Sequence, residues 1–410
     1  MNTLRFGVLV LPLALTACAR PSTSPAPAAG GWLTTWTSSN QQAVRPPTDS
    51  VDRVPTYVNR TLRQIVHTSI GGNRIRVRFS NEYGDRPLVI AKARIALRDS
   101  GAAIMPASDR AVTFDGREAI TIRPGATVYS DAVSFTLPNL ADLVISTYLP
   151  DTSRTATRHA LGRQTNYVSR PGDFSSARTF ASDTTVSMWF FLAGVDVMNS
   201  SATGVIATIG NSITDGAGAT QNANARWPDV LARRLLASGE APKGVANAGI
   251  SGNRVLTFGT GPSALARFDR DVLMQSGVTH VIILEGINDI GNSQLTRITA
   301  EDLIFGLHQL AKRARERGLV VIGATLTPAG PRPQFTPEHE AKRAAVNTWI
   351  RTSGVFDAVI DFDAVTRDPE RPTQFLPVYD SGDHLHPSDA GYKAMGEAID
   401  LKLFNLRPRP

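Results

Sequence analysis

One serine, one histidine and one aspartate stand where their side chains could together activate a hydroxyl group. Ser212 lies in the segment GNSITDG, residues 210–216, directly after the apolar run Val205–Ile209. This pattern is typical of a tight strand-to-helix turn, which would lift the hydroxyl above a sheet near the start of a helix. A serine there is also a common helix cap, and the segment by itself favours capping.

The histidine and the aspartate that could act on this serine lie near the end of the chain, in DHLHP (383–387). An imidazole that takes a proton from serine needs a carboxylate to fix its tautomer and to stabilise the imidazolium. The three-residue offset lets Asp383 contact one ring nitrogen of His386, which leaves the other nitrogen for Ser212. Zinc binding by Asp383, His384 and His386 is the alternative, but no His-Glu-x-x-His helix or cysteine cluster supplies further ligands.

Two further segments follow apolar runs and could stabilise a negatively charged oxygen. The segment NAGISGN (247–253) is a glycine-rich loop whose backbone amides can approach a ligand closely. In EGIND (285–289), the side-chain amide of Asn288 could donate to a developing oxyanion. Taken singly, each segment is equally consistent with an ordinary loop or turn.

Together, these four segments resemble the four sequence blocks of the SGNH, or GDSL-type, serine esterases, and they occur in the same order. The resemblance runs from residue 204 to the C-terminus, which is roughly half of the chain. It implies a carboxylic ester hydrolase in which Ser212 is the nucleophile, His386 the general base and Asp383 the residue that orients His386. It further implies an oxyanion hole formed by Ser212, Gly252 and Asn288, and neither a metal nor an organic cofactor.

The first block departs from the family pattern at one position. It has Gly-Asn-Ser-Ile where Gly-Asp-Ser-Leu is usual, so that Asn211 replaces an aspartate. That aspartate is not the triad carboxylate, and asparagine keeps one acceptor while it gains two donors, so we expect the turn to survive. The sequence also lacks a Gly-x-Ser-x-Gly motif around Ser212, since the next glycine is Gly216. This absence argues against an ordinary α/β-hydrolase.

From residue 204 onward, buried apolar runs alternate with helical stretches, which predicts an α/β fold: a doubly wound, mainly parallel five-stranded sheet of the SGNH, flavodoxin-like type. The five runs are Val205–Ile209, Gly244–Ala248, Val278–Leu284, Leu319–Leu326 and Ala358–Asp361. Helix starts are indicated by Pro228, Thr299 with Asp302, Thr336-Pro337 and Ser388-Asp389. In such sheets, functional residues lie at the carboxyl ends of the strands. The segments GNSITDG, NAGISGN and EGIND each follow one of the predicted strands.

Residues 32–200 have a different texture, and we expect them to form an accessory domain ahead of a catalytic domain at 201–410. Short alternating segments such as RIRVRF (74–79) and AITI (119–122) are separated by Gly, Pro, Asp and Asn. This pattern is typical of an all-β sandwich or jelly roll. The region is similar to the β-rich N-terminal part of one bacterial branch of SGNH proteins. We expect Trp189, Phe190 and Phe191 to form a buried strand or a domain contact.

The first 31 residues predict export and lipid attachment. Residues 1–18 resemble a lipoprotein signal peptide, because Arg5 precedes the apolar run Phe6–Leu15 and LTAC (15–18) is similar to a bacterial lipobox. We expect Cys18 to be lipidated and residues 19–31 to be a flexible tether. The protein would then be a cell-envelope lipoprotein, facing the periplasm or the cell surface, and otherwise a secreted protein. A cysteine inside a signal peptide that is cut elsewhere is the alternative reading.

Composition limits the classes of partner. Lys and Arg outnumber Asp and Glu by 43 to 36 among the 410 residues, but they are scattered, which argues against nucleic acid. Cys18 is the only cysteine, so no intramolecular disulfide can form. The segments 226–228 and 253–262 could shape a pocket or be a plain helix start and loop. The remaining histidines are expected to be structural: His67, His159, His280, His308 and His339.

The substrate class follows from these predictions only in outline. We expect a small-molecule or polysaccharide ester, and membrane contact only through the lipid anchor. A surface-anchored enzyme with an appended β-domain favours deacetylation of O-acetylated carbohydrates, by analogy with the fold. A lipase or arylesterase of broad short-chain specificity and a non-catalytic glycan-binding envelope lipoprotein are the alternatives.

Overall fold

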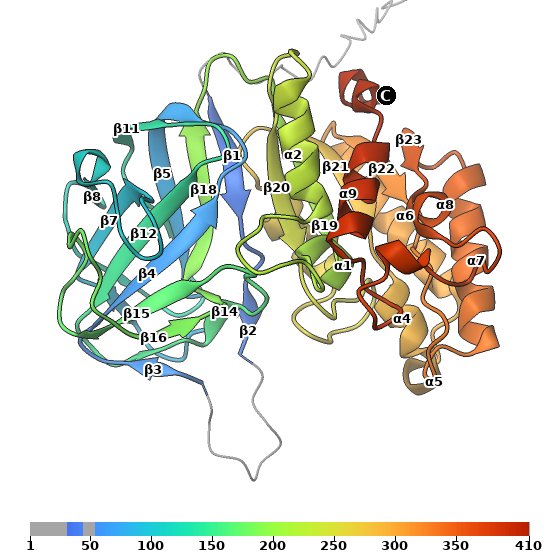
Figure 1. The fold of residues 1–410 in the computed structure, drawn as a ribbon, viewed down its shortest axis with the longest axis horizontal. Coiled ribbons are helices and arrows are strands. Elements are labelled where there is room, and N and C mark those ends of the chain that lie inside the picture. The colour runs from blue at the N-terminus through green and yellow to red at the C-terminus, as the bar shows by residue number, and fades with distance from the viewer. Residues whose placement is uncertain (1–30, 44–53, 410) are drawn as a thin grey trace, which may run out of the picture.

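The computed structural model describes residues 31–43 and 54–409 (Figure 1). Antiparallel strands make up its N-terminal half, and a parallel sheet with helices makes up its C-terminal half, so the predicted fold class is confirmed. The signal peptide, Cys18 and residues 19–30 of the tether lie outside the described residues. Within the described ranges, no helix combines the length and the apolar character that a membrane crossing requires.

Two antiparallel sheets form most of the N-terminal half. The first contains β1 (Trp32–Thr37), β18 (Leu192–Met198), β5 (Gly72–Ser80) and β10 (Thr127–Tyr129) in spatial order, with β11 (Val133–Leu137) also paired to β5. The second contains β16 (Ser182–Val186), β15 (Asn166–Pro171), β4 (Arg60–His67), β12 (Asp142–Leu149), β7 (Lys92–Leu97) and β8 (Arg110–Val112). Both sheets contribute fully buried side chains, such as Val77 and Ile145, to one shared core.

Three small antiparallel sheets and one 3-10 turn complete this half. They are β13 (Ser153–Arg154) with β3 (Thr56–Tyr57), β6 (Leu88–Ile90) with β9 (Ile120–Ile122), and β17 (Trp189–Phe190) with β14 (Thr157–His159) and β2 (Gln41–Gln42); the 3-10 turn is η1 (Pro106–Ser108). Trp189 and Phe190 form a buried strand, as the sequence predicts, and the ring of Trp189 meets that of Trp36 edge-on.

One five-stranded parallel sheet organises the C-terminal half. Its strands, in spatial order, are β20 (Gly244–Gly249), β19 (Val205–Gly210), β21 (Val278–Leu284), β22 (Val320–Ala324) and β23 (Ala358–Ile360). All five predicted apolar runs form strands, because a strand buried on both faces requires continuous apolar sequence. Gly210 is in register with both Gly249 and Leu284, so that β19, β20 and β21 end at one edge of the sheet.

Helices pack on this sheet and on one another. In front of the sheet in Figure 1, α2 (Trp227–Ala237) packs against α9 (Asp389–Ala398), which also contacts α8 (Phe362–Thr366). Another group consists of α6 (Ala300–Glu316), α3 (Ala264–Phe268) and α7 (Pro337–Thr352). The shorter segments are α1 (Ser212–Asp215), α4 (Ile287–Gly291), α5 (Ser293–Thr296), the π-helical turn η2 (Asp269–Leu273) and the 3-10 turns η3 (Pro377–Tyr379) and η4 (Leu401–Asn405). The predicted helix starts are confirmed, for example by the hydroxyl of Thr299, which accepts the amide of Asp302.

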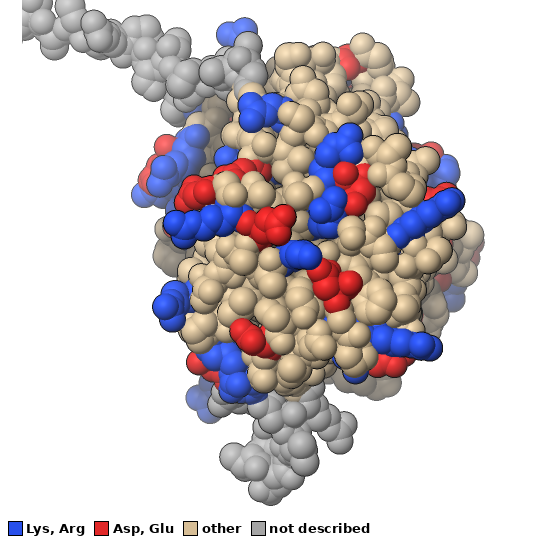
Figure 2. Space-filling view, turned by 90° about the vertical axis from the view of Figure 1, so that its left-hand side faces the viewer, with Lys and Arg blue, Asp and Glu red and all other residues tan. Residues whose placement is uncertain are grey.

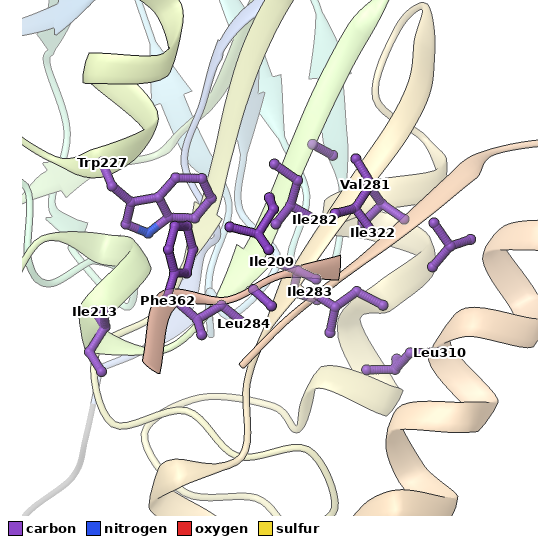
Figure 3. Close-up of a cluster of buried hydrophobic side chains, with 14 of the residues drawn as sticks. Ile209, Ile213, Trp227, Val281, Ile282, Ile283, Leu284, Leu310, Ile322 and Phe362 are labelled. Carbon is purple, nitrogen blue, oxygen red and sulfur yellow. The ribbon is translucent and has the colours of Figure 1, made fainter. Parts of the chain in front are cut away.

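An apolar core fixes the helices over the strands that lead to the predicted site. Figure 3 shows Trp227 of α2 beside Phe362 of α8, with ring centroids 5.4 Å apart. Both rings are fully buried, together with Ile209 of β19 and Leu284 of β21. Core packing of Ile209 and Leu284 therefore holds the ends of β19 and β21 in place.

The two halves contact each other along β1. The hydroxyl of Thr34 donates to Asp196 at 2.9 Å and accepts the amide of Ser276, which precedes β21, at 3.0 Å. Arg76 donates both to Asp196 and to the hydroxyl of Ser276. The domain boundary near residue 200 stays a prediction; it falls between β18 and β19, which belong to different sheets.

Charged side chains of both signs are interspersed on the outer face of the β-rich half (Figure 2). Basic residues do not gather there into one tract that could follow a nucleic-acid backbone. This distribution agrees with the scatter of Lys and Arg along the sequence.

Candidate active site

Ser212, His386 and Asp383 lie in one chain of hydrogen bonds, although 174 positions separate the serine from the histidine. Nε2 of His386 is 2.8 Å from Oγ of Ser212, and Nδ1 is 2.5 Å from Oδ2 of Asp383. The second carboxylate oxygen, Oδ1, accepts the backbone amides of Leu385 at 3.0 Å and of His386 at 2.8 Å. Asp383 therefore holds both the imidazole and the loop that carries it.

A short turn, residues 210–216, presents Ser212 and is called the serine turn below. Oδ1 of Asn211 accepts the amide of Ile213 at 3.0 Å and caps α1, of which Ser212 is the first residue. A Cβ atom on Gly210 would lie only 2.2 Å from Oγ1 of Thr214, so a glycine is required where β19 meets the turn. The capping role that the sequence suggested for Ser212 thus belongs to Asn211, and the serine hydroxyl remains available to His386.

The loop that carries His386 is packed against residues that follow the serine turn. The hydroxyl of Tyr392, in α9, donates to the carbonyl of Ala217 at 2.6 Å. A Cβ atom on Gly218 would lie 2.7 Å from the carbonyl oxygen of Pro387. These contacts keep the C-terminal loop close to Ser212 without a covalent link.

The electrostatics of Asp383 suit a group that fixes a tautomer. Partial burial acts to raise its pKa, but the hydrogen bonds from the His386 ring and from the amides of His386 and Leu385 outweigh it, and the pKa falls to about 2. The carboxylate is therefore ionised throughout the pH range in which an imidazole ordinarily titrates. In that state it accepts the hydrogen on Nδ1 and leaves the lone pair of Nε2 facing Ser212.

The predicted oxyanion donors Gly252 and Asn288 follow β20 and β21, the two strands that flank β19, at the same edge of the sheet. Gly252 follows β20 with a φ of +78°, and a Cβ atom there would lie 2.6 Å from Oγ1 of Thr260. Nδ2 of Asn288, in α4, donates to the carbonyl of Asn253 at 2.9 Å, which fixes the amide and leaves its second hydrogen for another acceptor. The role of Gly252 and Asn288 as oxyanion donors stays a prediction.

Residues 208–394 match the family model of the GDSL-like lipase/acylhydrolase family. This part of the chain belongs to that family. The match contains the serine turn, Gly252, Asn288, Asp383 and His386, and the protein is therefore a carboxylic ester hydrolase. The resemblance drawn from the four sequence blocks is thus confirmed at the level of the family.

Three solved structures of esterases and lipases illustrate the similarity, each over about half of this esterase chain. The aryl esterase of M. smegmatis is 18% identical with a TM-score of 0.41, covering 50% of this chain and 99% of that one. The acetylxylan esterase of Geobacillus stearothermophilus, a catalytic mutant, is 21% identical with a TM-score of 0.38, covering 48% and 92%. A GDSL-like lipase of Bacteroides thetaiotaomicron is 20% identical with a TM-score of 0.39, covering 49% and 88%. No curated protein matches this sequence.

Asn211, the departure from the family pattern, joins the serine turn of the esterase to a buried acidic residue. Its Nδ2 donates to Oε1 of Glu285 at 3.1 Å, while its Oδ1 caps α1. Glu285 is fully buried, and burial raises its pKa well above the usual value, although the nearby charge of Arg267 and the hydrogen bond from Asn211 oppose this effect. The amide of Asn211 thus uses both a donor and the acceptor, which an aspartate could not do.

A second buried acid supports the loop that contains Asn253. Asp289, which follows Asn288, accepts the amides of Val255 at 2.8 Å and of Leu256 at 3.1 Å. Burial nevertheless raises the pKa of Asp289 to about 6. Because it holds the start of the 253–262 segment, Asp289 acts on the candidate site through the backbone rather than by direct contact.

Sequence reasoning missed a buried arginine behind the site. Arg267 of α3 donates to the carbonyls of Gly210 at 3.1 Å and Ala248 at 2.6 Å, and to Oδ2 of Asp271 at 2.9 Å. It therefore ties together the carboxyl ends of β19 and β20. An arginine in a short helix gives no sequence signal that separates this role from an ordinary surface position.

Other side chains singled out in the sequence have simpler surroundings. Trp227 is buried in the core at the start of α2, and Arg226 donates to the carbonyls of Asp215 and Gly162. Nδ1 of His384 is 2.5 Å from Asp380 rather than bound to Asp383. Within residues 31–43 and 54–409, no group of three or more His, Cys, Asp or Glu side chains is arranged to hold a metal ion.

Proposed function

We propose that the protein is an exported, lipid-anchored serine esterase that removes short acyl groups, acetyl above all, from carbohydrate esters through an acyl-enzyme on Ser212. The observation that carries the catalytic part is the 2.8 Å contact between Nε2 of His386 and Oγ of Ser212, with Nδ1 of His386 held by an ionised Asp383. This order of groups can make a serine hydroxyl nucleophilic near neutral pH.

In the proposed reaction, Oγ of Ser212 attacks the ester carbonyl carbon while Nε2 of His386 takes its proton. The carbonyl π electrons move onto the oxygen, which the backbone N–H groups of Ser212 and Gly252 and the amide of Asn288 stabilise. Collapse breaks the bond to the alcohol oxygen, which leaves with the proton from His386. Water then attacks the acyl-enzyme, His386 takes its proton, and the second collapse releases the carboxylic acid and returns the proton to Ser212.

The free donors at the site support the proposed oxyanion hole. Among the hydrogen bonds of the described chain, neither the backbone N–H of Ser212 nor that of Gly252 has an acceptor. Ser212 is only 3% exposed, and buried N–H groups are ordinarily satisfied. Transition-state stabilisation requires unpaired donors of this kind beside the nucleophile.

Replacement of Ser212 tests the catalytic proposal. In Ser212→Ala, we expect hydrolysis of 4-nitrophenyl acetate to fall by at least about 10³-fold, and covalent labelling by a fluorophosphonate to be lost. Ser251→Ala is the matched control, because its backbone amide rather than its hydroxyl contacts Asp215. Undiminished turnover in folded Ser212→Ala would refute the proposal.

The substrate proposal requires a separate comparison. A series of 4-nitrophenyl esters from acetate to long-chain acyl groups should show kcat/KM falling with chain length, and acetylated xylan should release acetate. A preference for long acyl chains, without acetate release from polysaccharide, would favour a lipase instead.

The lipid anchor is tested by metabolic labelling. Cells that express the wild-type protein and are fed a labelled fatty acid should yield labelled protein, and cells that express Cys18→Ala should not. Label retained in Cys18→Ala would contradict lipidation at that residue.

A further inference from the structure

The β-rich half places a buried histidine behind the serine turn. His159, the last residue of β14, is 3% exposed. Its Nδ1 is 2.9 Å from the carbonyl oxygen of Ser39, and its Nε2 is 2.8 Å from Oδ1 of Asp215. A carbonyl oxygen only accepts, so Nδ1 carries a hydrogen, and Nε2 must carry a second one to donate to the carboxylate. With Asp215 as a carboxylate, His159 is therefore an imidazolium ion paired with it.

The charge balance agrees with this protonation. Burial acts to lower the pKa of His159, but the negative charge of Asp215 and the hydrogen bond to it outweigh burial, and the pKa is raised above its usual value. Asp215 is itself buried, so the two charges neutralise each other in the interior.

Asp215 links the two segments that present Ser212 and Gly252. It is the last residue of α1, three positions after Ser212. Its Oδ2 accepts the amide of Ser251 at 2.8 Å, and Ser251 directly precedes Gly252. A Cβ atom on Gly249 would lie 2.4 Å from the backbone nitrogen of Asp215, so the end of β20 packs directly on the serine turn. The carboxylate thus connects the two backbone segments that contain Ser212 and Gly252, the residues whose own N–H groups lack acceptors.

Neighbouring residues of the β-rich half reinforce the same contact. The carbonyl of Gly162 accepts Nη2 of Arg226, whose Nε donates to the carbonyl of Asp215 at 2.6 Å. Nε of Arg163 donates to the carbonyl of Gly216 at 3.2 Å. The segment 159–163 therefore meets the end of the serine turn directly at Asp215 and Gly216, and a third time through Arg226.

A small cavity adjoins the ion pair. Its volume is about 40 Å³, and its lining includes His159, Asp215, Arg226 and Gln164. Within the described chain, Nε2 of the buried Gln164 has no hydrogen-bond partner. The space is large enough for ordered water, and loss of the His159 ring would enlarge it to admit a small planar cation.

We propose that His159 is a positioning residue of the esterase: its imidazolium holds Asp215, and through Asp215 it sets the spacing between the backbone N–H groups of Ser212 and Gly252. The inference rests on the proposed oxyanion role of those two groups. Oxyanion donors act only within a few tenths of an ångström of hydrogen-bonding distance. A small displacement between the two segments would therefore lower the reaction rate.

Three substitutions and one control test this role. In His159→Ala and Asp215→Asn, we expect kcat for 4-nitrophenyl acetate to fall roughly ten- to hundredfold with KM little changed. His159→Gln, which can still donate to Asp215, should recover part of the loss. Asp196→Asn is the matched control, because Asp196 is also a buried carboxylate between the two halves but contacts Thr34 and Ser276, away from the serine turn. Its kcat should equal that of the wild type.

Added imidazole provides a second measurement, which would not change if His159 had a purely structural role. It should raise kcat of His159→Ala at a pH at which imidazole is protonated, and not that of Asp196→Asn. The hydrolysis that imidazole itself catalyses is measured with the Ser212→Ala/His159→Ala double variant and subtracted. Rescue confined to His159→Ala supports the proposal.

The outcomes separate this inference from the proposed function. Wild-type kcat in folded His159→Ala, or an equal loss in Asp196→Asn, would overturn the positioning role while Ser212→Ala remained inactive. Activity in Ser212→Ala would instead overturn the proposed function. If His159→Ala does not fold, as judged by circular dichroism, wild-type kcat in both His159→Gln and Asp215→Asn overturns the inference.

Discussion

Asp383 binds His386 twice, through the ring and through the backbone. Oδ2 is 2.5 Å from Nδ1 of the imidazole, and Oδ1 accepts the amide of the same residue at 2.8 Å. The ring therefore takes its orientation from a residue three positions away, rather than from a distant part of the fold. Only the contact with Ser212 depends on the packing of the C-terminal loop against the serine turn.

Removal of the Asp383 charge should disable His386 as the proposed general base. In Asp383→Asn, the side-chain amide cannot accept the hydrogen on Nδ1 while its oxygen serves the backbone amides, so the tautomer with hydrogen on Nε2 is favoured. We expect kcat to fall by about 10³- to 10⁴-fold, with partial recovery at alkaline pH. Steady-state hydrolysis of 4-nitrophenyl acetate measures the loss. Asp380→Asn is the control, since Asp380 pairs with His384 instead; equal losses in both variants would contradict the assignment.

Truncation of Asn288 should remove one donor of the proposed oxyanion hole. In Asn288→Ala we expect kcat to fall by about 10²- to 10³-fold, with a smaller change in KM, because the donor acts mainly in the transition state. Asn292→Ala provides the comparison, since Nδ2 of Asn292 donates only to the carbonyl of Asn288 at 2.8 Å. A change confined to KM would instead assign Asn288 to ground-state binding.

The buried acid Glu285 should make stability depend on pH. Its raised pKa means that the folded protein keeps a proton which the unfolded chain releases above about pH 4.3. The free energy of unfolding therefore falls as pH rises from there toward the folded pKa. Glu285→Gln removes this slope and keeps an acceptor for Asn211, so its advantage over the wild type should grow with pH.

Urea unfolding at several pH values measures that slope. The exposed Glu316→Gln variant is the control, since Glu316 lies on the solvent-facing side of α6. Parallel curves for the wild type and Glu285→Gln would show that Glu285 does not hold the proton.

Loss of Arg267 should destabilise the ends of β19 and β20. Arg267→Met leaves the carbonyls of Gly210 and Ala248 without this donor and removes one contact of Asp271. We expect the free energy of unfolding to fall by about 3–5 kcal/mol. Arg313→Met, which removes a half-exposed ion pair with Asp269, should cost about 1 kcal/mol or less. Chemical denaturation compares the two variants, and similar losses would count against the special position of Arg267.

The parallel sheet and the main candidate residues could be predicted because both are local signals. A continuous apolar run indicates a buried strand, and the polar segment after it lies at the functional edge. The sequence predicts that Ser212 and His386 converge at that edge, and in the structure Nε2 of His386 lies 2.8 Å from Oγ of Ser212. Caps such as Thr299 with Asp302 are equally local, since donor and acceptor are three residues apart.

The order of the antiparallel strands could not be predicted from the sequence, because the alternation of apolar and polar residues indicates a strand but not the strand with which it pairs. Trp32 is in register with Met198, and Leu143 lies between Val66 and Leu97 in the second sheet. His159 was expected to be structural for a similar reason: its partner Asp215 lies 56 positions away and in the other half. Asp215 belongs to the GNSITDG segment, but no motif surrounds His159, and nothing in the sequence indicates that the two residues pair.

The ion pair between His159 and Asp215 also bears on how such a protein can evolve. If recombination moved the C-terminal half into another gene, the carboxylate of Asp215 would lose the imidazolium that covers it and pairs with it. A viable descendant would have to acquire a neutral residue at position 215 or inherit the segment around His159 as well. We therefore expect the two halves to be transmitted as one genetic unit rather than exchanged as separate modules.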